Sequence, residues 1–186
     1  MSSMLPNVLS SSTSNTSVAD ELSSSNETYV TKRGAKLNLE SIGPKPTKKV
    51  ALICCMDARI DAFSAFGFKE GESHVIRNGG GRASDSIRSL VISQQQLGTD
   101  EIIIMHHTDC GFFTFTEDKF RQTLKSNGYP GPDVDLMSFM PMSADDIDES
   151  VKEDVEYLKN HALIKKDSKI SGWVNDLKDG SVRRVV

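Results

Sequence analysis

Three short strand-like segments, separated by stretches of helical pattern, constrain the fold of this chain more than any other feature. They lie at residues 48–55, 73–78 and 101–107. The first and third are largely apolar along their whole length, which is typical of strands covered on both faces of a sheet. Helical patterns at 60–68 and 84–97 separate the three segments. Strands that alternate with helices predict an α/β fold built on a parallel sheet.

The remaining C-terminal sequence completes the predicted fold. We expect a helix around residues 116–126, a Gly- and Pro-rich loop at 128–142, and a helix over 143–161 whose first serine is the N-cap. Two alternating strands then meet at Asp179 and Gly180, a strong hairpin signal. We therefore predict a mainly parallel sheet of strand order 2-1-3-4, with a C-terminal antiparallel edge strand and flanking helices.

Length and charge restrict the class of protein. A chain of 186 residues is long enough for one well-packed core and too short for two enzyme domains. The net charge is −4 and the basic residues are scattered among acidic ones, so we expect no nucleic-acid partner. No apolar run approaches the roughly 20 residues of a membrane span, so we also expect a soluble protein without membrane association.

The N-terminal segment has a different composition from the rest. Residues 1–25 are rich in Ser, Thr and Asn and predict a disordered arm, followed by an N-terminal segment at 26–47. The start lacks the features of a secretory signal, and its first arginine is Arg33, whereas transit peptides are Arg-rich. We expect a cytoplasmic protein, with organelle targeting by the arm as the open alternative.

Candidate metal ligands follow the first and third predicted strands. Cys55 ends the sequence of the first strand, and His107 and Cys110 occur in "MHHTDCG" at 105–111. In a 2-1-3-4 sheet the binding crevice lies between these two strands, so the three side chains should meet. Two thiolates and an imidazole suit Zn²⁺, and a three-ligand site leaves a fourth position open for catalysis. The alternative is that they are ordinary residues at the ends of buried strands.

The spacing of these residues resembles a known family. "CMDAR" at 55–59 with "HTDC" at 107–110 resembles the signature of β-class carbonic anhydrases, C-x-D-x-R followed by H-x-x-C. The resemblance covers residues 48–186 and includes "HVIRNGGGR" and "ISGWVNDLKDG". It is similar to the short branch of the family, which also contains carbonyl sulfide and carbon disulfide hydrolases.

The resemblance implies a zinc enzyme. It assigns Cys55, His107 and Cys110 as zinc ligands, and Asp57 with Arg59 as a catalytic dyad. The implied activity is reversible hydration of CO₂ to bicarbonate by zinc-bound hydroxide that the dyad orients. Carbonyl sulfide or carbon disulfide hydrolysis with release of hydrogen sulfide is the alternative, and a non-catalytic zinc-binding dimerisation module is a third possibility. The resemblance also implies a homodimer or dimer-based oligomer, with the 26–47 segment crossing to the partner.

The family resemblance also raises a question about Asp57. In some members the matching aspartate moves onto the zinc and inactivates the site, and Arg59 competes for its carboxylate. Ala58 and Gly79 replace the serine and alanine of many members, without removing a group that the mechanism requires.

Several other polar and aromatic residues have open roles. We expect His106 and Cys54, which alternate away from the site, to be packed in the core. The glycines of "NGGGR" at 78–82 form either an anion-binding nest or a tight turn. Arg77 and Asp109 serve the site or a subunit interface. The aromatic residues at 111–115 and the segment 136–142 either line the approach to the metal or pack between helices.

Overall fold

The computed structural model describes residues 17–34, 38–142 and 146–186, and contacts divide the chain into two units. The first unit, Met1–Ile42, contains α1 (Val18–Arg33) and α2 (Leu39–Ile42). Residues 18–25 of the segment predicted as a disordered arm are therefore helical, and residues 1–16 of that arm lie outside the described residues. No helix in the described ranges is long and apolar enough to cross a membrane.

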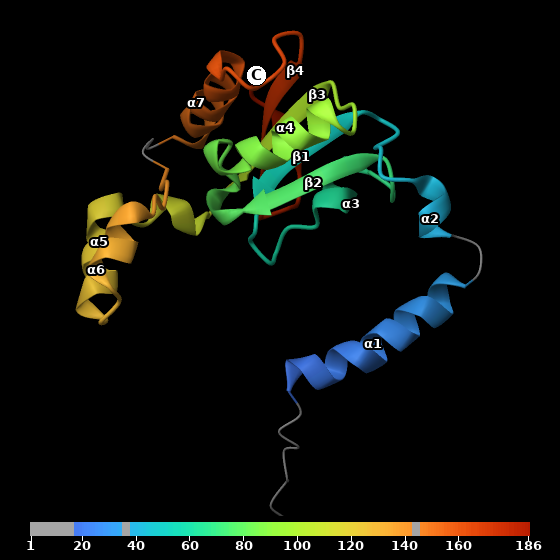
Figure 1. Cartoon of the computed structure of the whole chain (residues 1–186), viewed down its shortest axis with the longest axis horizontal. Coiled ribbons are helices and arrows are strands. Elements are labelled where there is room, and N and C mark those ends of the chain that lie inside the picture. The colour runs from blue at the N-terminus through green and yellow to red at the C-terminus, as the bar shows by residue number, and fades with distance from the viewer. Residues whose placement is uncertain (1–16, 35–37, 143–145) are drawn as a thin grey trace, which may run out of the picture. The chain divides into compact units, whose positions relative to one another are not determined.

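The second unit, Gly43–Val186, contains a five-stranded sheet of order β2-β1-β3-β4-β5 (Figure 1). The first four strands pair in parallel and β5 pairs with β4 in antiparallel. The predicted order and the antiparallel edge strand are confirmed. The strands are β1 (Val50–Cys55), β2 (Ser73–Asn78), β3 (Glu101–His107), β4 (Lys169–Asn175) and β5 (Val182–Arg184).

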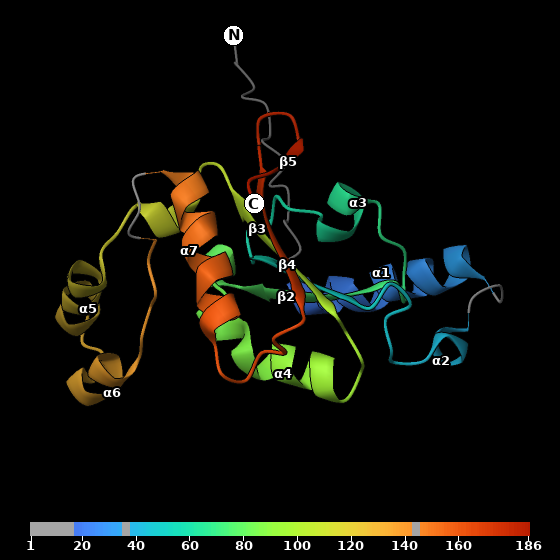
Figure 2. The same cartoon turned by 90° about the horizontal axis from the view of Figure 1, so that it is seen from above.

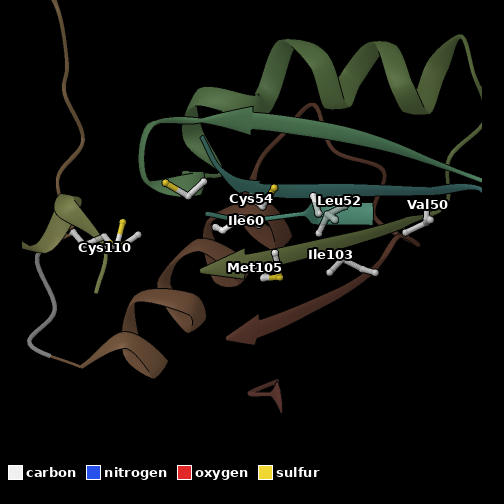
Figure 3. Packing of buried hydrophobic residues seen from close by; sticks show 10 residues of the cluster. Val50, Leu52, Cys54, Ile60, Ile103, Met105 and Cys110 are labelled. Atoms are coloured by element: carbon white, nitrogen blue, oxygen red, sulfur yellow. The ribbon is translucent and has the colours of Figure 1, made fainter. Parts of the chain in front are cut away.

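Side chains of the two central strands alternate between two hydrophobic layers. Leu52 and Met105 belong to a layer that includes Ala62 of α3 (Ala62–Phe66), and this layer is drawn in Figure 3. Ile53 and Ile104 face the opposite layer, which is covered by α4 (Ile87–Gln95) and α7 (Ile147–Asn160) (Figure 2). Helices on both faces explain why β1 is apolar along its whole length.

Local capping interactions explain where several helices begin. The Thr116 side chain accepts the N–H of Lys119 at the start of α5 (Glu117–Ser126). Asp146, whose side chain accepts the N–H of Asp148, is the N-cap of α7. The predicted N-cap, Ser143, lies outside the described residues.

The segment 128–142 is not only a loop, as the sequence predicted. It contains α6 (Gly131–Leu136), which packs against α5. The reason is that Pro132 lies in the first turn, where its fixed φ favours a helix and its missing N–H costs no hydrogen bond. The Pro and Gly residues that indicated a loop therefore begin a short helix instead.

Candidate metal centre

The structure brings Cys55, His107 and Cys110 together. Cys55 ends β1, His107 ends β3, and Cys110 lies in the turn that follows β3. Because β1 and β3 are adjacent and parallel, their carboxyl ends meet at one edge of the sheet. One ligand atom from each residue lies within 4.8 Å of the other two, and all three side chains are buried. This cluster can hold a metal ion.

The imidazole of His107 is oriented as a ligand. Its Nδ1 lies 2.9 Å from the backbone oxygen of Thr108, an acceptor that places the ring proton on Nδ1. Within the described part of the chain, the buried Nε2 has no hydrogen-bond partner. A buried polar atom without a partner costs about 1–3 kcal/mol. A metal ion in the cluster would satisfy this nitrogen, and the two-sulfur, one-imidazole donor set fits Zn²⁺.

The thiols of Cys55, Cys110 and Cys54 differ in the direction and cause of their pKa shifts. The Cys110 thiol donates a hydrogen bond to the Cys55 sulfur, and this contact lowers the pKa of Cys55 although burial opposes the shift. The same contact and burial raise the pKa of Cys110. Burial raises the pKa of Cys54 to about 11, so this thiol stays neutral in the core, as expected.

The carboxylate of Asp57 lies beside the cluster and is held by Arg59. Arg59 donates from Nε to Oδ1 at 2.9 Å and from Nη2 to Oδ2 at 2.8 Å. These bonds hold the pKa of Asp57 well below its usual range. Asp57 Oδ2 lies 3.9 Å from His107 Nε2. An ionised hydrogen-bond acceptor thus lies at the edge of the cluster.

Asp109 binds the other side of Arg59. Its Oδ2 accepts a hydrogen bond from Arg59 Nη1 at 2.8 Å, and its backbone oxygen accepts one from Arg59 Nη2 at 3.2 Å. Asp109 has a φ of 56°, a left-handed conformation that Asp tolerates better than most residues. Of the two roles left open by the sequence, this contact supports a role at the site.

Arg77 supports the loop that carries Asp57 and Arg59. From β2 it donates to three backbone oxygens, those of Cys55 at 3.1 Å, Asp57 at 2.6 Å and Ile60 at 3.2 Å. The sequence left this role open because its acceptors are backbone atoms, which no motif reveals. Arg77 therefore fixes the path of the chain from Cys55 to Ile60.

The glycine turn η1 (Gly79–Gly81) packs directly on the site. Gly80 and Gly81 have φ of 74° and 69°, and a Cβ on Gly81 would lie 2.8 Å from the backbone nitrogen of Cys55. The Phe112 ring covers Gly79 so closely that a Cβ there would lie 2.3 Å from it. The backbone N–H of Gly80 donates to the Cys55 sulfur. These contacts support the tight-turn interpretation of the glycine sequence.

His106 lies in a buried polar network behind the site. Its Nε2 is 3.2 Å from Asp154 Oδ2, and its Nδ1 is 3.1 Å from Ser150 Oγ. Asp154 also binds Arg82 at 3.0 Å and accepts the N–H of Ala83 at 2.9 Å. His106 is thus a packed, hydrogen-bonded histidine, as expected. Sequence reasoning missed Asp154, which resembles any other acidic residue of α7.

The aromatic residues form a packed row. Ring centroids are 5.4 Å apart for Phe112 and Phe115, 5.0 Å for Phe115 and Phe120, and 4.8 Å for Phe120 and Phe139. The row joins the turn after β3 to α5 and the loop after α6. This arrangement supports the helix-packing interpretation of these residues.

Comparisons with known proteins agree with this geometry. A family model described as "Carbonic anhydrase" matches residues 50–130. The chain is 40% identical to β-carbonic anhydrase 1 of Mycobacterium tuberculosis over 75% of this chain and 83% of that one. It is 33% identical to a carbon disulfide hydrolase of Acidithiobacillus thiooxidans over 74% and 78% of the two chains. The solved carbonic anhydrase from Glaciozyma antarctica has 44% identity and a TM-score of 0.81, covering 88% of this chain and 95% of that one.

Proposed function

Because this chain belongs to the β-carbonic anhydrase family, we propose that it catalyses the reversible hydration of CO₂ to bicarbonate at a zinc centre. Cys55, His107 and Cys110 would hold the zinc, and Asp57 and Arg59 would act as the catalytic dyad. The observation that carries the proposal is the two-bond contact between Arg59 and Asp57 beside the clustered sulfur and imidazole groups. A zinc site without catalysis would need the cluster and not this pair.

The residues of the cluster fit zinc. The unpartnered Nε2 of His107 and the sulfurs of Cys55 and Cys110 supply three borderline-soft donors, and the remaining position is left for a small ligand. Zinc bound there would supply a water acidified enough to act as a nucleophile near neutral pH, and would polarise the substrate oxygen.

Asp57 would orient the nucleophile. Its pKa is lowered chiefly by the Arg59 hydrogen bond, so Asp57 is an ionised acceptor that can take the O–H of the attacking group. That hydrogen bond would direct a lone pair toward the substrate carbon. Arg59 would keep the carboxylate in place, since both of its oxygens are bound by the guanidinium. Arg59 would thus compete with the metal for the carboxylate of Asp57 and keep that carboxylate off the metal.

Hydrolysis of carbonyl sulfide or carbon disulfide is the second candidate. The similarity to carbon disulfide hydrolases favours it, and the same proposed zinc ligands and dyad could serve that reaction. CO₂ is the preferred substrate in our proposal because the identity to the mycobacterial β-carbonic anhydrase is higher, 40% against 33%.

We also propose a dimer-based homo-oligomer. The first unit supports it, because Val18 and Leu22 lie one helical turn apart on α1 and are 72% and 62% exposed. A second copy would cover such side chains. Light scattering on the full chain and on a variant carrying Val18→Ser and Leu22→Ser would test this, and a monomeric wild type would contradict it.

Parallel initial-rate assays test the activity. Purified protein loaded with zinc would be assayed for CO₂ hydration by stopped flow and for hydrogen sulfide release from carbonyl sulfide and carbon disulfide. Metal content would be measured on the same sample, with Cys110→Ala as the control. Fast hydration with one zinc per chain supports the proposal, and slow hydration with efficient sulfide release would replace it with the second candidate. Bound zinc with neither reaction above the control would indicate a non-catalytic zinc module.

A further inference from the structure

The acceptor that orients His107 is a backbone carbonyl, and something must hold that carbonyl in place. His107 Nδ1 is 2.9 Å from the oxygen of Thr108, the next residue in the chain. Rotation of this peptide would remove the acceptor and allow the imidazole to turn or change tautomer. The support of the Thr108 peptide therefore bears directly on the cluster.

Thr108 is bound by three consecutive residues at the end of β4. Its backbone N–H donates to the oxygen of Asn175 at 3.0 Å. Its hydroxyl donates to Asp176 Oδ1 at 3.3 Å and accepts the N–H of Leu177 at 3.0 Å. The last paired residues of the two strands are His107 and Asn175. The hydroxyl thus extends the pairing of β3 and β4 one residue beyond the strands.

The segment that binds Thr108 is itself well fixed. Asp176 donates its N–H to Ser181 at 2.8 Å and accepts the N–H of Gly180 at 2.8 Å. Its carboxylate also accepts the N–H of Lys178 at 2.9 Å. The buried side chain of Asn175 donates to the backbone oxygens of Gly180 and Ser181. Thr108 is therefore held by a hydrogen-bonded hairpin rather than by a mobile loop.

We propose that Thr108 is a positioning residue for the metal centre, whose hydroxyl, held between Asp176 and Leu177, fixes the carbonyl that orients His107. The inference rests on the proposed zinc function, since it assigns the outer support of one proposed ligand. Thr108 touches no reacting atom and acts through His107. A purely structural role would affect the stability of the hairpin without affecting the metal.

Matched variants separate these two roles. Thr108→Val has nearly the same shape and removes both hydroxyl bonds, whereas Thr108→Ser keeps them. Asp176→Ala removes the acceptor of the Thr108 hydroxyl together with the bond from the Lys178 N–H, and it serves as a second variant should Thr108→Val fail to fold. Asp179→Ala is the control, because Asp179 accepts the N–H of Ser181 at the hairpin turn and makes no hydrogen bond with Thr108.

The measurements are zinc affinity by chelator competition, solvent exchange of the His107 Nδ1 proton by ¹⁵N NMR in the zinc-loaded full chain, and thermal stability. Removing a hydrogen-bond partner that orients a metal ligand typically weakens metal affinity about 10–100-fold. We therefore expect Thr108→Val to bind zinc about 10-fold more weakly than the wild type. The Nδ1 proton should also exchange faster. Thr108→Ser should match the wild type, Asp176→Ala should shift both readouts in the direction of Thr108→Val, and Asp179→Ala should change only stability.

Two results would overturn the inference while leaving the proposed function intact. One is a Thr108→Val or Asp176→Ala protein with wild-type zinc affinity and proton exchange. The other is an equal loss of affinity in Asp179→Ala, which would assign the effect to general loosening of the hairpin. A wild-type protein that binds no zinc would overturn the proposed function and this inference together.

Discussion

Arg59 binds both carboxylate oxygens of Asp57, with Nε 2.9 Å from Oδ1 and Nη2 2.8 Å from Oδ2. A third bond from Nη1 to Asp109 leaves the guanidinium fixed on two sides. Asp57 is consequently held by Arg59 rather than included in the cluster of Cys55, His107 and Cys110. In the proposed mechanism, this is the arrangement in which the carboxylate can accept a hydrogen bond from the nucleophile.

The first prediction concerns this pair. Asp57→Ala or Arg59→Ala is expected to lower kcat/KM about 100-fold, because a positioned proton acceptor contributes about 10²–10⁴-fold in rate. Zinc content should stay unchanged, since neither side chain belongs to the cluster. Stopped-flow rates with metal analysis check both points. Arg184→Ala is the control, because this arginine is exposed and its side chain donates to the oxygen of Val186, away from the cluster. Full activity in either dyad variant would rule out the dyad role.

The second prediction concerns the glycine turn. Gly81→Ala should lower the free energy of unfolding by more than about 2 kcal/mol, since the new Cβ meets backbone atoms of β1 at 2.8 and 2.9 Å and the φ is positive. Gly98→Ala has a similar φ, 76°, with no atom within 4 Å, and should cost only about 1 kcal/mol. Urea unfolding of both variants gives the difference. Equal losses would show that the close approach to Cys55 is unimportant.

Some features of the fold were predictable because their signals are local. The segments that form β1 and β3 are apolar runs of strand length. The strand order was a hypothesis typical of open α/β sheets, and the structure confirms it. The parallel pairing then brought Cys55 to His107, although they are far apart in sequence. By contrast, α6 was missed because proline and glycine give the same local signal for a loop and for a helix start.

The supporting residues could not be predicted, for a different physical reason. Arg77 donates to backbone oxygens of the dyad loop, and Asp154 binds a histidine and an arginine on other elements. A contact to a backbone oxygen cannot be recognised from the sequence, because every residue has such an oxygen. A buried acidic residue on α7 cannot be distinguished from its exposed acidic neighbours until the tertiary fold is known. The residues of the cluster belong to a recognisable sequence motif, whereas the residues that support them are identified only from tertiary packing.

The third prediction tests the Asp154 network. Asp154→Ala removes the partner of Arg82 and His106, whose side chains are 14% and 0% exposed. Leaving a buried charge unpaired costs about 3–5 kcal/mol, and we expect the free energy of unfolding to fall by that amount. Glu153→Ala, at the adjacent exposed position of α7, should change it by less than about 0.5 kcal/mol. Urea titrations of both variants are the test. A loss below about 1 kcal/mol in Asp154→Ala would mean that Arg82 finds another partner or reaches water.

The fourth prediction concerns pH and Glu117, at the start of α5. Its carboxylate accepts the N–H groups of Phe139 at 3.0 Å and Met140 at 3.1 Å, and pairs with Arg121 at 2.6 Å. Burial raises the pKa of Glu117, but the bonds from Phe139 and Arg121 outweigh it, so the pKa lies below its ordinary value. The ionised group therefore stabilises the folded state above the unfolded-state pKa of about 4.3.

That contribution should be lost as the pH falls through the lowered pKa of the folded state. Wild type should thus be more stable than Glu117→Gln near neutral pH, and the difference in unfolding free energy should shrink below about pH 4. Urea unfolding of both proteins over a pH series, with zinc removed, measures this difference without a contribution from metal release. Because other carboxylates titrate in both proteins, the comparison isolates Glu117. A difference that stayed constant across the series would show that ionisation of Glu117 does not contribute to stability.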